Sequence, residues 1–329
     1  MVKTLLDKEK WILRKHGLWM LFAVALTCAI LGTGNVAEAS VYHSKKDAAS
    51  GPAAEIRDGY LNGAELDLLK SQSDGQMSSS VIVSPSGGVI VVDGGRAEDE
   101  QHLVDTINAH GGRVSLWLIT HPHDDHLGAL TKILDTNPRP VQIDKIVYSF
   151  LANGDYQRGE NQGRMANLTD FQKALKNAGG TELVSSPAAG TVFTVGADVK
   201  ATVMNVPFYA DRATFNNSSV AYKVETGGRT MLFLGDLSRE GAAALLAATP
   251  DKSVLKADIL QMAHHGSGID GAGDELYSLI RPSVCLWPTP TWMWNAENDG
   301  YGVNALEKKM ASWGCRKDVR CDTADGILR

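Results

Sequence analysis

The sequence predicts an α/β sandwich in which mixed β-sheets are covered by helices. Short apolar segments of strand-like composition alternate along the chain with segments of helical period. Several successive strands are separated only by tight-turn residues, which makes them hairpins and excludes an all-parallel sheet. With 329 residues, 43% of them hydrophobic and 21% charged, the chain is long enough for one large core.

The N-terminal 57 residues are predicted to lie outside this domain. Five basic side chains precede residue 18, residues 18–31 are apolar, and Ala-Glu-Ala follows at 37–39. This layout is typical of a secretory signal peptide, here residues 1–39. The alternative is an uncleaved membrane anchor at 18–31, although that run is shorter than the roughly 20 residues of a membrane span. Residues 40–57 are small and polar and are interpreted as a linker. We therefore expect a secreted or extracytoplasmic protein, with no stable membrane span once the signal is cleaved.

The folded domain is predicted to occupy residues 58–329, and its first half begins with strands. The predicted strands of this half are 64–70, 79–84, 89–93, 115–120 and 144–150. The turn sequence P-S-G-G at 85–88 joins two of them in a hairpin. The predicted helices are 98–110, 126–134 and 164–178, and Gly111-Gly112 supplies a C-cap for the first helix.

The second half has the same mixture of elements. Its predicted strands are 191–195, 199–206, 220–225, 230–236 and 257–263, and its predicted helices are 239–248 and 303–310. The turn T-G-G-R makes a second hairpin, and Cys285 lies in a further buried strand, V-C-L-W. Beyond that strand, residues 287–295 are rich in aromatic side chains. This segment either packs under the C-terminal helix, which we favour, or lines a pocket that stacks on a base or a quaternary ammonium group.

The segment H-P-H-D-D-H at 121–126 holds three of the nine histidines of the chain and directly follows a predicted buried strand. His121 and His123 are two residues apart, so on extended backbone their side chains point the same way. Asp125 and His126 follow where the chain turns into a helix. Each pair suits one cation, and imidazole with carboxylate favours zinc, or manganese or iron where oxygen ligands dominate. The alternative, a solvated loop with an aspartate cap, is less consistent with this density of histidine.

This segment resembles the H-x-H-x-D-H motif of the metallo-β-lactamase superfamily. V-V-D-G-G at 91–95, L-F-L-G-D-L at 232–237 and A-H-H-G-S-G at 263–268 resemble the other motifs of the family, in the family's order. With F-N-N-S-S-V at 215–220, they are most similar to the branch that includes the metal-dependent domain of competence DNA-uptake proteins and bacterial phosphorylcholine esterases. The resemblance implies a four-layer αββα sandwich of the metallo-β-lactamase type.

The resemblance also implies a pair of divalent metal ions, with zinc expected first. The implied ligands are His121, His123, Asp125, His126, Asp236 and His265, with Asp236 bridging the two ions. Asp125 is also expected to be a catalytic residue. The chain departs from the family pattern because residues 127–235 contain no histidine, so the usual third-motif ligand is missing. One ion would then keep an open position for substrate or water.

Other residues are expected to act around these ligands. Asp93 is predicted to orient a ligand histidine rather than to bind metal. The sequence does not decide between His264 and His265 as the ligand. We take His265 as the ligand and His264 as a catalytic residue that bonds a phosphoryl oxygen or protonates the leaving group. Asn217 and Ser218 either donate hydrogen bonds to the substrate, Asn217 with a catalytic role, or form a turn before the next strand.

The expected function is that of a secreted hydrolase in which a metal-activated hydroxide cleaves phosphodiester-type bonds. The alternatives are an extracellular nuclease related to DNA uptake and a metal-binding surface module without activity. Loss of the signal peptide removes five bases and three acids and takes the formal net charge from −6 to −8. This acidity favours a small-molecule or surface phosphoester as the partner over nucleic acid. A disulfide between Cys315 and Cys321 is left open by the sequence.

Overall fold

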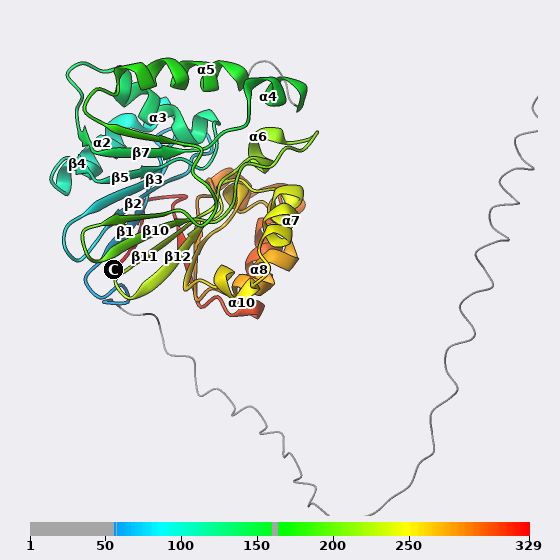
Figure 1. Ribbon diagram of the computed structural model, residues 1–329. Helices are drawn as coiled ribbons and strands as arrows, with labels where there is room; N and C mark the ends of the chain where they lie inside the picture. Colours follow the sequence, from blue (N-terminus) through cyan, green and yellow to red (C-terminus); the bar gives the residue numbers. More distant parts are fainter. Residues whose placement is uncertain (1–55, 57, 160–163) are drawn as a thin grey trace, which may run out of the picture. The chain divides into compact units, whose positions relative to one another are not determined.

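In the computed structural model, which describes residue 56, residues 58–159 and residues 164–329, two seven-stranded sheets lie between two layers of helices (Figure 1). This arrangement is the four-layer αββα sandwich that the sequence predicted. The predicted signal peptide and, apart from Ile56, the predicted linker lie outside the described residues.

The first sheet contains both hairpin strands and parallel strands. Its strands, in spatial order, are β16 (Gly326–Leu328), β1 (Glu65–Leu68), β2 (Ser79–Val83), β3 (Val89–Asp93), β5 (Leu116–Leu118), β7 (Lys145–Tyr148) and β8 (Glu182–Ser185). Neighbours from β16 to β3 are antiparallel, and neighbours from β3 to β8 are parallel. The predicted hairpin is confirmed, with Ser79 paired to Asp93.

The second sheet also contains both parallel and antiparallel strands. Its strands, in spatial order, are β15 (Lys317–Arg320), β14 (Val284–Trp287), β13 (Ile259–Gln261), β12 (Arg229–Phe233), β11 (Tyr222–Thr226), β10 (Val199–Val203) and β9 (Val192–Val195). The strands from β15 to β12 are parallel, and those from β12 to β9 are antiparallel. The strands β8, β15 and β16 were not predicted, because E-L-V-S, K-D-V-R and G-I-L are too short and too polar to show a strand period.

Helices cover the outer face of each sheet. The first sheet carries α2 (Glu100–Ala109), α3 (Asp124–Asp135) and α5 (Met165–Ala174), and the second carries α7 (Arg239–Ala248), α8 (Asp274–Ile280) and α10 (Val303–Trp313). The short elements are α4 (Asn153–Gly159), α6 (Thr214–Asn217), α9 (Thr291–Trp294), β4 (Arg113–Val114) and β6 (Gln142–Ile143). None of the described helices combines the length and the apolar character required to cross a membrane.

The hydrophobic core consists of three layers, which explains the apolar runs in the sequence. On β3, Ile90 and Val92 point into the layer between the sheets, whereas Val89 and Val91 pack under the helices. Both faces of this strand are buried, so V-I-V-V is apolar without alternation. By contrast, β10 alternates buried Val199, Ala201 and Val203 with more exposed residues, because helices do not cover its outer face.

The topology brings the carboxyl ends of the parallel strands of both sheets to one edge of the sandwich. The segments that follow β3, β5, β12 and β13 therefore leave the sheets at this edge. In open α/β sheets, ligand sites form outside the carboxyl ends of strands. This edge is where the predicted site residues lie.

Candidate metal centre

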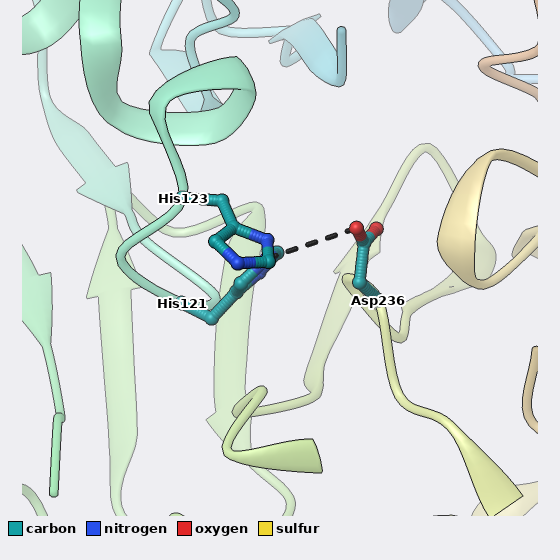
Figure 2. Close-up of side chains that lie close together, drawn as sticks. All are labelled: His121, His123 and Asp236. Atoms are coloured by element: carbon teal, nitrogen blue, oxygen red, sulfur yellow. Dashed lines mark hydrogen bonds and ion pairs between the residues drawn. The ribbon is translucent and has the colours of Figure 1, made fainter. Parts of the chain in front are cut away.

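The predicted ligands gather into two groups at this edge. His121, His123 and Asp236 form one group, and Asp125, His126 and His265 form the other; within each group the ligand atoms lie within 4.8 Å of one another. All six side chains are buried. Figure 2 shows the first group, in which the imidazoles of His121 and His123 face the Asp236 carboxylate.

Asp236 lies between the two groups. One carboxylate oxygen, Oδ2, lies 3.7 Å from Nε2 of His121, and the other, Oδ1, lies 3.1 Å from Nε2 of His126. Oδ2 is also 3.5 Å from Nε2 of His265. A single carboxylate therefore reaches both groups of imidazoles, which is the arrangement needed to bridge two cations.

Local backbone explains why these side chains converge. His121 and His123 lie on the extended chain after β5, and His123 is the N-cap of α3 with φ −78° and ψ 152°. The helix begins at Asp124, two residues before the predicted start, so Asp125 and His126 belong to its first turn. Acidic side chains in the first turn suit the positive end of the helix dipole.

Two of the imidazoles are fixed by their Nδ1 atoms. Nδ1–H of His126 donates to Asp93 at 2.7 Å, and Nδ1 of His121 lies 3.1 Å from the hydroxyl oxygen of Thr120. That hydroxyl donates to Asp93 at 2.9 Å, which leaves its oxygen free to accept from His121. Asp93 thus contacts a ligand histidine and not the cation pocket, in the position that the sequence predicted for it. These contacts direct Nε2 of both imidazoles to the pocket, where Nε2 of His121 lies 3.0 Å from Nδ1 of His123.

His265 is held in the same way, because its Nδ1–H donates to the carbonyl of Pro288 at 3.0 Å. Among the described residues, Nε2 of His126, Nε2 of His265 and Oδ1 of Asp236 approach other side chains of the site at 3.1–3.2 Å, but these contacts lack hydrogen-bond geometry. Buried polar atoms without partners are costly unless a ligand satisfies them. Their donor chemistry, imidazole nitrogen with carboxylate oxygen, fits divalent cations of the zinc class.

The carboxylates and imidazoles shift each other's protonation. Burial tends to raise the pKa of Asp125, but the contact with His265 outweighs it and holds that pKa below its usual range. Burial tends to lower the pKa of His265, but the charge of Asp236 outweighs it and raises that pKa to about 9. Burial lowers the pKa of His123 to about 3. The raised pKa of His265 reflects the negative charge of the buried carboxylates, which also favours a cation in the pocket. A bound cation would replace the proton of His265, whereas His123 is already neutral.

His264 and His265 differ in direction although they are adjacent. Nε2 of His265 points into the pocket, whereas Nε2 of His264 lies 3.2 Å from the amide nitrogen of Asn216. Both residues have positive φ values, 51° and 54°, and Asp93 has φ 58°. Non-glycine residues in this region are strained, and such strain concentrates at functional sites. The geometry favours His265 over His264 as the ligand.

The structure does not bring Asn217 and Ser218 to the pocket in the roles predicted for substrate binding. The Asn217 amide donates to the carbonyl of Arg212 and accepts from the backbone N–H of Gly241, so it ties α6 to α7. The Ser218 hydroxyl contacts the phenol of Tyr156 and is fully buried. Both side chains are engaged in structural contacts and have no group free for a substrate.

Two residues that were assigned no role from the sequence lie nearer to the pocket. Asn216 is 6% exposed and its Oδ1 has no partner among the described residues. Arg164 is exposed, and its guanidinium lies 2.7 Å from Nε2 of His123. Asn216 could have been found by its proximity to the missing third-motif histidine. Arg164 has no local signal, because it lies 41 residues from its contact.

The cysteines do not pair as Cys315–Cys321. The three described cysteines are free thiols, and Cys315 and Cys321 lie in different layers of the core. The Sγ atom of Cys315 instead lies near that of Cys285 on β14.

Comparison with known proteins matches this fold and these motifs to one family. The family model described as the metallo-beta-lactamase superfamily matches residues 73–267, more than half of the chain. The chain belongs to the metallo-beta-lactamase superfamily. Members of this superfamily are mostly metal-dependent hydrolases with a dinuclear metal site. The six buried side chains described above are the candidate ligands for such a site in this chain.

Individual relatives are distant or partial. The ComE operon protein 3 of Bacillus subtilis is 35% identical over 80 residues, which are 24% of this chain and only 10% of that protein. A solved CmlA beta-hydroxylase mutant is 13% identical, with a TM-score of 0.51 over 81% of this chain and 54% of that one, and it supports the fold alone. The metallo-beta-lactamase fold protein YhfI from Bacillus subtilis is 12% identical, with a TM-score of 0.49 over 80% of this chain and 98% of that one.

Proposed function

We propose that this protein is an extracytoplasmic hydrolase that cleaves phosphodiester-type bonds with two divalent cations. The observation that carries the proposal is the position of Asp236, whose two carboxylate oxygens face imidazoles of different ligand groups. Zinc is the first choice for the cations, with manganese and iron as alternatives, because the proposed ligands are four imidazoles and two carboxylates. Such a cation pair supplies a water nucleophile active near neutral pH and neutralises negative charge that develops in the transition state.

The protein's own residues would hold and orient these parts. His121, His123 and Asp236 would hold one cation, and Asp125, His126 and His265, with Asp236, the other. His264 is not one of the proposed ligands, but it directly precedes the ligand His265. We propose that it moves a proton to the leaving group. Nε2 of His264 lies 3.2 Å from the amide nitrogen of Asn216, so substrate would have to displace this contact before Nε2 could carry a proton to the leaving group.

The charge at the mouth of the pocket supports an anionic substrate. Arg164 is exposed and its guanidinium lies against the ligand His123. A guanidinium binds phosphoryl oxygens in a planar, bidentate manner. A small-molecule or surface phosphoester is the proposed partner. The proposed extracytoplasmic location rests on the predicted signal peptide, residues 1–39.

Activity assays on ligand variants test this proposal. Protein prepared with zinc, manganese or iron would be assayed on bis-p-nitrophenyl phosphate, p-nitrophenylphosphorylcholine, single-stranded DNA and a chromogenic β-lactam. We expect hydrolysis of a phosphodiester that chelator abolishes, and a loss of about 1,000-fold or more in His121→Ala and Asp236→Asn. His110→Ala, a histidine outside the pocket, is the matched control and should keep full activity.

Each other result identifies a different function. Preferential cleavage of DNA would make the protein a nuclease, and cleavage of the β-lactam alone would overturn the phosphodiester assignment. Bound metal without hydrolysis of any substrate would indicate a metal-binding surface module.

A further inference from the structure

A cavity of about 190 Å³ lies at the same edge of the sandwich as the metal centre. It is lined by residues 70–77 between β1 and β2, by residues 288–292 after β14, and by Cys321 and Asp322 after β15. The loops are joined across the cavity, because the indole N–H of Trp292 donates to the carbonyl of Asp74 at 2.9 Å. The amide of Gln76 also contacts the sulfur of Met293 at 3.3 Å. The cavity therefore has a defined wall on both sides.

Both loops are directly attached to metal-ligand candidates. Pro288, which lines the cavity, accepts the hydrogen bond from Nδ1 of His265. Met77, which also lines it, precedes Ser78, whose backbone N–H donates to the carbonyl of Asp125 at 2.9 Å. The cavity wall is therefore linked to two candidate ligands of the second group. Pro288 bonds His265 directly, and Met77 is adjacent to Ser78, which bonds Asp125. His265 lies between the two sites, because its Nδ1 contacts Pro288 at the wall of the cavity while its Nε2 faces the cation pocket. A group attached to a phosphoester at the cations would extend past His265 to enter the cavity.

The lining combines apolar and polar side chains. Met77, Pro288, Pro290 and Trp292 provide apolar surface. Lys70, Asp74, Thr291 and Asp322 provide donors and acceptors. Trp292 is 40% exposed, and it meets the ring of Tyr301, itself 39% exposed, edge to face at 5.2 Å. Two large aromatic side chains that remain exposed at the edge of an active-site region provide a stacking surface.

We propose that this cavity, the Trp292 subsite, binds a planar aromatic heterocycle of the nucleobase class that is attached to the scissile phosphoester. The inference rests on the proposed hydrolytic function and specifies its substrate. A ring of this class stacks on the indole and offers polar edges to the lysine, threonine and aspartate side chains. The cavity is too small for a long acyl chain, and the Lys70 ammonium opposes a quaternary ammonium group. Most of the aromatic segment 287–295 packs with α10 as the sequence predicted, because Trp287, Met293 and Trp294 are buried with that helix. Trp292 is the exception, and its exposure favours ligand binding.

Two substrates with the same reacting group test the subsite. Thymidine 5′-(p-nitrophenyl phosphate) and methyl p-nitrophenyl phosphate release the same leaving group, but only the first carries a base. Trp292→Ala should lower kcat/KM for the thymidine ester roughly tenfold, the effect of losing one base–aromatic stack, and leave the methyl ester unchanged. Trp292→Phe should keep most of the activity. Ile327→Ala, a similarly exposed apolar residue on β16, is the control and should change neither substrate.

Binding measurements separate this inference from the hydrolytic proposal. Calorimetry with thymidine 5′-monophosphate and deoxyribose 5-phosphate should show at least tenfold tighter binding of the nucleotide, and Trp292→Ala should abolish the difference. Equal affinities, or equal losses for both esters in Trp292→Ala, would overturn the subsite. If neither ester is cleaved but the nucleotide is preferred, the subsite stands and the hydrolytic function fails. A thermal melt of Trp292→Ala that matches the wild type excludes misfolding as the cause.

Discussion

Asp93 is a buried residue that contacts a candidate metal ligand and does not itself face the candidate cation pocket. Its carboxylate accepts from the imidazole of His126 and from both the backbone N–H and the hydroxyl of Thr120. The side chain is fully buried, and burial raises its pKa. Its φ of 58° is a strained backbone conformation for a residue other than glycine. The hydrogen bonds of this carboxylate fix His126 with its Nε2 directed to the pocket.

Replacing this carboxylate with an amide should weaken metal binding. In Asp93→Asn the side chain keeps its size but loses the negative charge that orients His126 and raises its basicity. We expect the affinity for zinc to fall roughly 10–100-fold, measured by competition with a chromophoric chelator. Asp198→Asn, at a surface carboxylate that binds Ser86, is the control. Unchanged affinity in Asp93→Asn would show that the tautomer of His126 is set by other contacts.

At the scale of an element, α2 is attached to the first sheet by two histidine–aspartate contacts. Nε2 of His102 lies 2.9 Å from the carboxylate of Asp325, and Nε2 of His110 lies 3.7 Å from that of Asp67. The hydrogen bond with Asp325 raises the pKa of His102, whereas the pKa of Asp325 is lowered, mainly by its hydrogen bond with His102 against the effect of burial. The pair therefore connects the helix to the strand β16 most strongly when His102 is protonated and Asp325 is ionised.

The stability that His102 contributes should depend on pH. Because its folded pKa is raised, the contribution is fully present below the unfolded pKa of about 6.5 and is lost as pH rises through the folded pKa. His102→Gln should therefore cost about 0.5 kcal/mol of unfolding free energy at pH 5.5 and close to nothing at pH 9, since partial exposure screens the pair. Urea denaturation at the two pH values measures the difference. An equal cost at both would show that the charge of His102 is irrelevant.

At the scale of the whole molecule, the metal centre connects the two sheets. Asp125 and His126 follow β5 of the first sheet, whereas Asp236 and His265 follow β12 and β13 of the second. The contact of His265 with Asp125, 3.2 Å between Nε2 and Oδ2, already crosses from one sheet to the other. Cations held between these side chains would link the layers and stabilise the folded state, because the unfolded chain cannot assemble the ligands.

Removing the metal should therefore lower the melting temperature. At a zinc concentration about 1,000 times the Kd, binding contributes about 4 kcal/mol, which corresponds to a shift of roughly 10 °C for a domain of this size. Calorimetric melts with zinc and with chelator measure this shift. Asp236→Asn should lose most of it, whereas His110→Ala should keep it. A melting temperature that chelator does not change would mean that no cation links the sheets.

The sequence by itself determined the features that depend on local pattern. The strand and helix periods, the hairpins and the density of histidine at 121–126 are local, so they predicted the sandwich, the family and the residue types of the site. The structure placed Asp125 and His126 on the first turn of α3, close to where the chain was expected to turn into a helix.

Only the tertiary structure decided which distant side chains meet. It separated His265 from His264 by consecutive left-handed backbone conformations, and it turned Asn217 into a link between α6 and α7. It brought Arg164 to His123, and it joined Trp292 to Asp74 from loops more than 200 residues apart. The physical reason is that these contacts depend on how two sheets pack and twist against each other. That packing is a property of the whole core, and no short stretch of sequence encodes it.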